Sequence, residues 1–502
     1  MGREARKGAI YNYLNLLLII VTGAVLTPYV IRSLGASQYG LYTLMGGILP
    51  YMTLLDLGLS RTITRFVSYY RVHNDEEGQA QFMTTAAHIY GAVVLLLLSI
   101  GAIIYYHVDA IWGQHFTASE LNDVRQMLLI IILAQAIIVP GNAFTSICYG
   151  CGYFAFPRAV QPIKYIVRTI CIVALLMYGY KAVALIALEA VLNVLIVIST
   201  YVYVRKRAKQ WCRFSDKHGD YKQVLTYGMW IALYATTCAL QWNVAQIIAG
   251  ITTDAATVGV VGIGIVLGNM YGYFAETINR MTMPRASNFV KKNPSGREVT
   301  AEMTRVGRVV AIIQVGVLGA FIIMGRAFVE LWAGNMYGDS FYYALIMMSA
   351  WTIQQSQEYG NALLEAKGCV RVMSIINFIC IFAAAILSYF ASLKYGVMYI
   401  MVTLAVGTLL VTIINNVYYR YRLQLDVVSY FKGVYARIAV VLMVIVAVSI
   451  GLNRYIEGVY SWLGLTITAV VYVIMYALAT YLFVLTSSER EYLKDHVQRK
   501  RQ

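Results

Sequence analysis

Ionisable side chains recur at helical spacing inside very apolar stretches of this sequence. Glu189 and Asn193 lie four residues apart, as do Glu276 and Arg280, so each pair would share one face of a helix. A charged group at the centre of an apolar span costs at least ~2.5–3.5 kcal/mol. We therefore expect these side chains to face a protein interior or a water-filled cavity.

A further stretch carries four polar residues at spacings of four, three and four, which also predicts a single helical face. These residues are Gln354, Glu358, Asn361 and Glu365, and another apolar stretch carries Gln241 and Asn243 near its middle. The simplest arrangement has all of these side chains facing one central hydrophilic cavity. We expect Glu365 to form a surface ion pair near Lys367.

Two kinds of chemistry fit this pattern. The carboxylates could bind or relay a coupling cation, while the amides and aromatic rings contact a polar substrate. Alternatively, the same groups could form hydrogen bonds between helices, with each carboxylate neutral or paired. The sequence leaves both readings open.

Arginines gather near one end of several apolar stretches, where guanidinium groups could hold a phosphate through two parallel hydrogen bonds. They are Arg61, Arg65, Arg168, Arg280 and Arg285. Retention of cationic loops in the cytoplasm would explain most of them equally well. Arg168 differs because it lies about two turns inside its stretch, where it needs a partner. Arg61, Arg168 and Arg280 are the candidates for diphosphate binding.

Metal and redox chemistry find little support. Cys148 and Cys151 form a lone C-x-x-C without a second pair or a nearby histidine, and the spacing of the six histidines suits no metal. The seven cysteines suggest no disulfide framework. We expect no cofactor, and a proton or sodium gradient as the driving force.

The elements that position these residues are membrane-spanning helices. Hydrophobic residues make up 60% of the 502 positions and charged residues only 13%, outside the usual range of soluble domains. The apolar runs are long and do not alternate, so they indicate helices rather than barrel strands. Fourteen spans are predicted, at about 9–31, 40–58, 84–106, 126–147, 163–180, 183–204, 223–250, 257–279, 309–332, 342–364, 373–391, 395–417, 434–452 and 463–486.

The basic residues alternate between connections, as expected when cationic loops stay in the cytoplasm. Of the 40 lysines and arginines, 33 fall on one side of the predicted spans, together with both termini. This distribution places both termini in the cytoplasm. It also explains the net charge of +16 without nucleic acid as a partner. No connection is long enough for a soluble domain, so any site must lie within the helical bundle.

A weak internal repeat appears at an offset of 219 residues. It pairs Gly40 with Gly259 and carries Arg61 onto Arg280. Many transporters consist of two related halves with the substrate site between them. The predicted parts are a six-helix lobe (1–204), a basic linker (205–222), a second six-helix lobe (223–417), two appended helices (418–486) and a basic tail (487–502).

Specific stretches resemble a known family. SLGASQYGLYTL (33–44) and LDLGLSRTITRF (55–66) are similar to the second-helix signature of bacterial oligosaccharide flippases. YGCGYFAFPRAVQPIKYIVRT (149–169) and Pro284 with Arg285 agree with such proteins. These flippases are polysaccharide transporters of the multidrug/oligosaccharidyl-lipid/polysaccharide exporter superfamily.

The resemblance implies a function and a location. Such proteins move an undecaprenyl-diphosphate-linked oligosaccharide to the outer leaflet of the bacterial cytoplasmic (inner) membrane, for O-antigen, lipopolysaccharide or other surface polysaccharide. It implies ion-coupled alternating access of two lobes, membrane lipids as surroundings, and a polysaccharide polymerase with its chain-length machinery as partners. The family's cavity is cationic, whereas the stripe at 354–365 is acidic.

Other functions remain open. A lipid II flippase also has fourteen spans, whereas a multidrug or cation antiporter of the same superfamily typically has twelve. A membrane-embedded glycan polymerase or glycosyltransferase would need a large outer loop or a cluster of catalytic carboxylates. The longest outer loop, 107–124, shows no convincing acid pair. We therefore expect a transporter and not an enzyme.

Overall fold

The computed structural model describes residues 3–56, 58–279, 282–453, 461–485 and 490. Within them the chain is helical and contains no strand. It forms two compact units, residues 1–262 and 263–502, with the boundary inside one helix. The lobes predicted at 1–204 and 223–417 remain a prediction.

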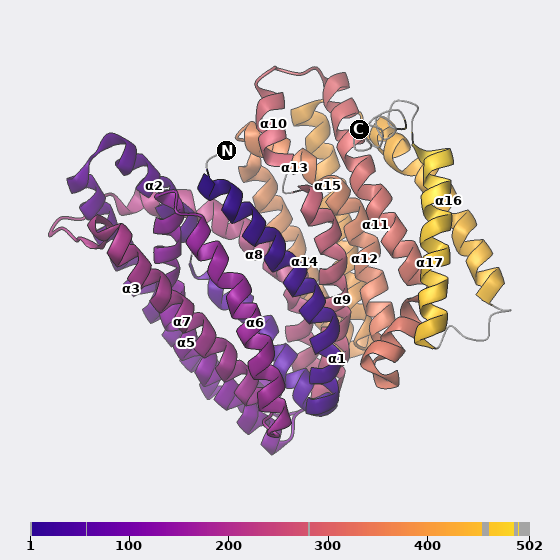
Figure 1. The fold of residues 1–502 in the computed structure, drawn as a ribbon, viewed down its shortest axis with the longest axis horizontal. Coiled ribbons are helices and arrows are strands. Elements are labelled where there is room, and N and C mark those ends of the chain that lie inside the picture. The colour runs from indigo at the N-terminus through magenta and orange to yellow at the C-terminus, as the bar shows by residue number, and fades with distance from the viewer. Residues whose placement is uncertain (1–2, 57, 280–281, 454–460, 486–489, 491–502) are drawn as a thin grey trace. The chain divides into compact units, whose positions relative to one another are not determined.

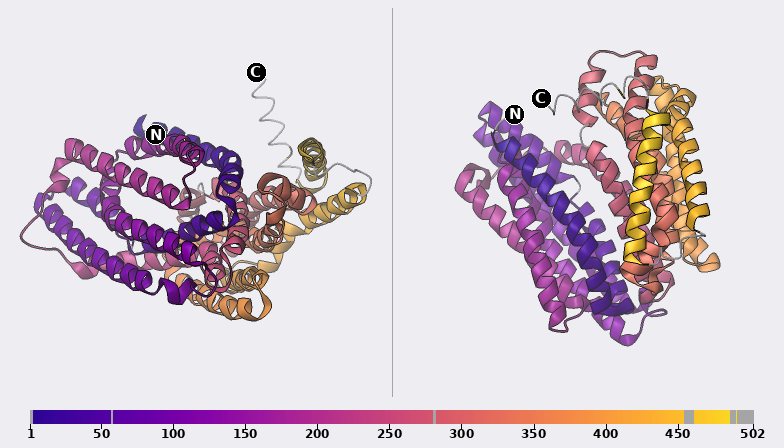
Figure 2. Two further views of the ribbon diagram at one scale, coloured as in Figure 1. Left: turned by 90° about the horizontal axis from the view of Figure 1, so that it is seen from below. Right: turned by 45° about the vertical axis from the view of Figure 1, so that its right-hand side comes forward.

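Long helices that run side by side build the first unit (Figures 1 and 2). Helix α5 packs on α7, α1 packs on α6 and α8, and α2 and α3 pack on α5. The helices are α1 (Arg3–Leu54), α2 (Leu59–His73), α3 (Glu76–Tyr106), α4 (Val108–Trp112), α5 (Ala118–Gly150), α6 (Ala155–Met177), α7 (Ala182–Arg207), the short η1 (Lys209–Cys212) and α8 (Tyr221–Thr252).

The second unit is also a bundle, in which α14 packs on α15, α11 on α16 and α12, and α10 on α13. Helix α9 (Ala255–Asn279) begins in the first unit and continues into the second. The remaining helices are α10 (Thr282–Val290), α11 (Gly296–Ala333), η2 (Asn335–Tyr337), α12 (Ser340–Ser356), α13 (Glu358–Ala366), α14 (Val370–Tyr395), α15 (Met398–Leu423), α16 (Val427–Asn453), α17 (Trp462–Ala479) and η3 (Thr480–Val484).

Within the described residues, each of the fourteen predicted segments falls mainly on helical backbone. Ten helices within the described ranges are long and apolar enough to cross a membrane. The other four segments lie on α1, which carries two of them, on α8, and on α12 with α13. In α1 the two segments are separated at Gly35, whose φ of 74° favours glycine. The chain is therefore an all-α, multi-pass membrane protein.

The signature at 55–66 builds a tight turn between α1 and α2. Gly58 has a φ of 71°, and the Asp56 carboxylate accepts hydrogen bonds from the Ser60 N–H (3.0 Å) and the Tyr90 hydroxyl (2.8 Å). Leu59 and Ile63 then enter the core with no exposed surface. These residues fix the start of α2 and tie it to α3.

One expected helix is broken. The segment at 342–364 divides at Gln357 into α12 and α13, so the expectation of one continuous helix is wrong there. The Tyr430 hydroxyl donates to the Ser356 carbonyl (2.9 Å), and the Tyr435 hydroxyl donates to the Thr352 carbonyl (3.1 Å). Side chains of α16 thus bind carbonyl groups beside the break, which is how broken helices are tolerated in membranes.

The two glycines of the weak repeat meet in the first unit. A Cβ atom built on Gly40 would lie 1.7 Å from the carbonyl oxygen of Ala255, at the start of α9. A Cβ atom on Gly259 would lie 3.4 Å from the Gly40 Cα atom. The backbones of α1 and α9 therefore touch without an intervening side chain.

We predict that Gly40→Ala destabilises the protein, because the added methyl group must push α9 away at a cost of ~1–3 kcal/mol. The measurement is the melting temperature Tm of the detergent-purified protein. Gly46→Ala is the matched control in α1, since a Cβ atom there has nothing within 4 Å. Equal Tm values for the two variants would contradict this packing.

A second prediction concerns the break at Gln357. Tyr430→Phe should lower the free energy of unfolding by ~1–3 kcal/mol, because the Ser356 carbonyl loses a donor in a buried place. Tyr421→Phe removes the same hydroxyl from a residue that is 79% exposed, and should leave stability unchanged. Denaturant titration of both variants measures the difference, and no loss in Tyr430→Phe would refute the role assigned to this hydrogen bond.

Candidate functional site in the first unit

Three helices of the first unit bring together a half-buried group of charged and polar residues. Lys164 and Arg168 lie one turn apart on α6, and Glu189 and Asn193 lie one turn apart on α7. Tyr42 reaches the same place from α1. The pairing follows from helix geometry, because each pair has a spacing of four residues and so projects from one face. We call these five residues the α6–α7 cluster.

Glu189 is the centre of this cluster. Its Oε2 atom accepts a hydrogen bond from the Arg168 Nε atom at 2.7 Å, while Oε1 contacts the Lys164 ammonium group. Asn193 bridges the other side: its Oδ1 atom accepts from Lys164 at 2.9 Å and its Nδ2 atom donates to Glu189 at 3.4 Å. One carboxylate therefore binds two cations.

The cluster is shielded and carries an unbalanced charge. The exposed fractions of the Lys164, Arg168 and Glu189 side chains are 11%, 22% and 25%. Two positive groups and one negative group leave a net charge of +1. Charged groups within spans are costly and mark ion or substrate pathways. Such a cluster can hold Glu189 in its ionised form or release its cations to another anion.

Arg168, Glu189 and Asn193 are separate candidates in the sequence, and the structure joins them. Lys164 was not predicted as a site residue, because it lies at the edge of the span expected at 163–180. Helix α6 begins at Ala155, so Lys164 lies well inside it. The spacing of Lys164 and Arg168 was the signal that could have identified the pair.

Tyr42 is the other cluster residue that was not predicted from the sequence. Its hydroxyl accepts a hydrogen bond from the Arg168 Nη2 atom at 3.1 Å. Tyr42 belongs to the 33–44 stretch that carries the family resemblance. A tyrosine in an apolar helix is usually a core or interface residue, so nothing in its spacing indicated an arginine partner.

The other candidate arginines lie elsewhere. Arg61 is exposed in the first turn of α2, and no contact among the described residues joins it to the α6–α7 cluster. Arg280 lies outside the described residues. Their predicted contact with a diphosphate remains a prediction.

Three candidates lie on α8 and α9. Gln241 is buried, and Asn243 donates a hydrogen bond to the Ala239 carbonyl one turn earlier at 3.4 Å. Glu276 is exposed and belongs to the part of α9 in the second unit.

The acidic stripe lies in the second unit, on both sides of the break at Gln357. Asn361 donates a hydrogen bond to Glu358 at 2.9 Å and accepts one from the Tyr419 hydroxyl. Gln354 lies before the break in α12, and Glu358 begins α13. The break separates these residues into two helices, so the stripe continues as a polar contact with α15.

Comparison with known proteins gives distant relatives. The chain is 18% identical over 405 residues to a protein named as an O-antigen transporter of Shigella flexneri, which covers 78% of this chain and 92% of that protein. It is 19% identical over 288 residues to the membrane protein EpsK of Bacillus subtilis (strain 168), covering 56% of each chain.

Solved structures share the fold. The lipid II flippase MurJ, in its inward closed conformation, superimposes with a TM-score of 0.73 over 95% of this chain and 98% of that chain, at 12% identity. An inward-facing multidrug resistance MATE family transporter of the MOP superfamily gives 0.61 over 83% and 94%, at 13% identity.

The family itself is established by a match to a whole-family sequence pattern. The pattern of the polysaccharide biosynthesis proteins matches residues 5–277, which is more than half of the 502 residues and includes the whole α6–α7 cluster. The protein belongs to the polysaccharide biosynthesis protein family.

Proposed function

We propose that this protein is a flippase that moves an undecaprenyl-diphosphate-linked oligosaccharide from the cytoplasmic to the outer leaflet. The observation that carries the proposal is the net positive, shielded α6–α7 cluster within the family-matched part of the chain. The distant likeness to proteins named as O-antigen transporters supports the same class of cargo.

The cluster suits the diphosphate of such a lipid. Arg168 can offer a guanidinium fork to phosphate oxygens, and Lys164 adds a compact charge beside it. In the structure, the Glu189 carboxylate contacts both of these cations. A diphosphate that enters must compete with this carboxylate, so the two anions are alternative partners of the same two cations.

This competition supplies a route to ion coupling. A proton or sodium ion that binds Glu189 would weaken its hold on Lys164 and Arg168 and free them for the diphosphate. Departure of the ion would return the cations to Glu189 and expel the diphosphate. The gradient would thereby act on substrate affinity through one carboxylate.

The oligosaccharide needs hydrogen-bonding groups rather than charge. In the second unit, Glu358 and Asn361 lie at the start of α13 with Tyr419 beside them, and Gln354 lies on α12. Together with Gln241, Asn243 and Glu276, these are the residues we assign to sugar or ion contacts. Arg61 and Arg280 remain candidates for the diphosphate.

The proposed protein works in the bacterial cytoplasmic membrane with both termini in the cytoplasm. The distribution of basic residues supports this orientation. A flippase of this class would deliver its cargo to a polymerase on the outer side, so a polysaccharide polymerase and its chain-length machinery are the proposed partners.

A lipid II flippase is the second candidate, because the fold resembles MurJ over nearly the whole chain. Lipid II also carries a diphosphate, so only the sugar portion separates the two functions. A multidrug antiporter that binds cations fits less well, since the α6–α7 cluster repels positive charge.

The experiment that tests the proposal uses proteoliposomes with fluorescent undecaprenyl-diphosphate lipids. One lipid carries an oligosaccharide repeat and the other carries the lipid II headgroup. Accessibility of the label to an external quencher reports movement between leaflets, with and without proton or sodium gradients. Movement of the oligosaccharide lipid supports the first function, movement of lipid II alone supports the second, and movement of neither refutes both.

A charge-count prediction tests the α6–α7 cluster. Arg168→Gln lowers its net charge from +1 to 0 and should weaken binding of the diphosphate lipid about tenfold. Arg168→Gln with Glu189→Gln restores +1 and should recover much of that loss. The measurement is equilibrium binding of the labelled lipid to purified protein.

Arg158→Gln is the matched control for that experiment, because Arg158 lies on the same helix and faces the Phe154 ring instead. It should bind like the wild type. Equal affinity in Arg168→Gln and the wild type, or no recovery in the double variant, would contradict the competition between Glu189 and the diphosphate.

A separate prediction concerns coupling. Glu189→Gln should bind the lipid at least as tightly as the wild type, since both cations remain and the competing carboxylate is gone, but transport should no longer accelerate when a gradient is applied. The proteoliposome assay measures the ratio of rates with and without the gradient, which should fall to about one. A gradient response as large as in the wild type would remove Glu189 from the coupling step.

A further inference from the structure

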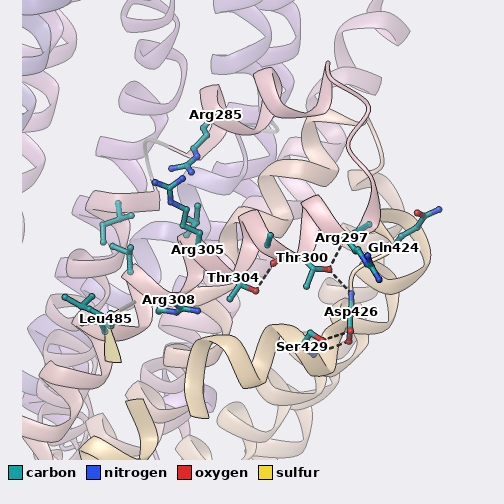
Figure 3. A pocket seen from close by; sticks show the side chains of 16 residues that line it. Arg285, Arg297, Thr300, Thr304, Arg305, Arg308, Gln424, Asp426, Ser429 and Leu485 are labelled. Atoms are coloured by element: carbon teal, nitrogen blue, oxygen red, sulfur yellow. Dashed lines mark hydrogen bonds between the residues drawn. The ribbon is translucent and has the colours of Figure 1, made fainter. Parts of the chain in front are cut away.

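A second collection of cationic residues lines a pocket of about 1400 Å³ in the second unit (Figure 3). Its walls come from the end of α9, helices α10 and α11, the turn between α15 and α16 with the start of α16, and Leu485 after η3. The pocket lies in a different unit from the α6–α7 cluster and shares no residue with it. Any ligand here would therefore occupy its own site.

Four arginines line this pocket. Arg297, Arg305 and Arg308 come from α11, where Arg297 and Arg308 are about three turns apart and Arg305 precedes Arg308 by about one turn. Arg285 comes from α10, and Figure 3 shows its guanidinium group and that of Arg305 pointing toward each other. Like charges that face each other favour an anion between them.

The described residues balance only part of this charge. Arg285 binds Glu302, with N–O distances of 2.5 and 2.6 Å, and the Arg308 Nε atom donates to the Gly433 carbonyl at 3.0 Å. Arg297 and Arg305 are exposed and make no hydrogen bond or ion pair with side chains in the described ranges. Both are therefore available to a ligand.

Asp426 is the carboxylate among the described lining residues, and it is already engaged. The Ser429 hydroxyl and backbone N–H donate to it at 2.5 and 3.1 Å, which holds the pKa of Asp426 below its usual range. The Asp426 N–H in turn donates to Thr300 at 3.0 Å. This carboxylate serves the start of α16 and offsets only one of the four positive charges.

One part of the lining is apolar and continues along α11 beyond Arg308. Val309 is 46% exposed, and Ile312 follows it along the same helix, while Leu485 faces the pocket near Arg308. A free inorganic anion gains no favourable contact from such an apolar wall. A ligand with a phosphate at one end and a hydrocarbon chain at the other would contact both parts.

We propose that this pocket binds a phosphate group carried by a lipid. Arg297 and Arg305 would hold the phosphate oxygens, with Arg285 and Arg308 adding to the field, while the hydrocarbon chain lies along Val309 and Ile312. Basic pockets between spans on the cytoplasmic side are recognised by anionic headgroups. The phosphate could belong to a membrane phospholipid or to a polyprenyl diphosphate.

The test is native mass spectrometry of the full-length protein with three lipids: phosphatidylglycerol, undecaprenyl diphosphate and undecaprenol, which has no phosphate. All proteins carry Arg168→Gln, so that the α6–α7 cluster contributes little. Arg297→Gln/Arg305→Gln should weaken binding of both phosphate lipids about tenfold and leave undecaprenol unchanged. Arg371→Gln/Arg422→Gln removes the same charge from outside the pocket and should bind like the parent.

Each outcome bears on the proposal. Selective loss of phosphatidylglycerol, of undecaprenyl diphosphate or of both supports it and identifies the source of the phosphate. Equal loss in the two double variants would reduce the effect to general surface charge and refute the site. Complete displacement by an equal concentration of inorganic phosphate would show an anion site without a lipid. Because this experiment measures lipid binding and not transport, a negative result here is distinguishable from a negative result in the flippase assay.

Discussion

Lipid offers no hydrogen bonds, so every polar group within the helices of this protein needs a partner supplied by the protein or its ligand. This constraint explains why Glu189 touches two cations and an amide at once. It also explains why hydroxyl groups of α16 bind carbonyl groups beside the break at Gln357. These polar features of both units follow from this requirement.

The same constraint gives the α6–α7 cluster its capacity to respond. A half-buried carboxylate that neutralises one of two cations leaves one positive charge without a fixed counter-ion. Removing either partner alone from such an arrangement is costly, whereas exchanging one anion for another keeps the balance. A site built this way favours the exchange of one bound anion for another. A carrier requires such exchange, whereas a structural ion pair does not.

Much of the fold could be predicted from the sequence, because long apolar runs and the absence of alternation specify membrane helices regardless of tertiary context. The helix boundaries were less predictable. Helix α6 starts at Ala155 rather than near 163, because the polar residues before Lys164 interrupt the apolar run but not the helix. The break at Gln357 could not be predicted, because its cause lies in tyrosines more than seventy residues away.

The sequence predicted the types of residue in the candidate site, but not which residues would contact one another. Glu189, Asn193 and Arg168 stand out because charge in an apolar run is rare. Tyr42 does not, since its partner is revealed only when α1 packs on α6. The four-arginine pocket could not be predicted from the sequence either. Basic residues are common at that end of the spans, so nothing indicated that those of α10 and α11 would converge.

The backbone contact between Gly40 and the start of α9 has a mechanical consequence. Helices that interlock through side chains resist sliding, because each knob must leave its hole and change rotamer before the next can enter. Here a bare stretch of α1 meets the Ala255 carbonyl and Gly259 with no knob between them. At this point direct backbone contact, and not the interlocking of side chains, fixes how closely α1 and α9 approach each other.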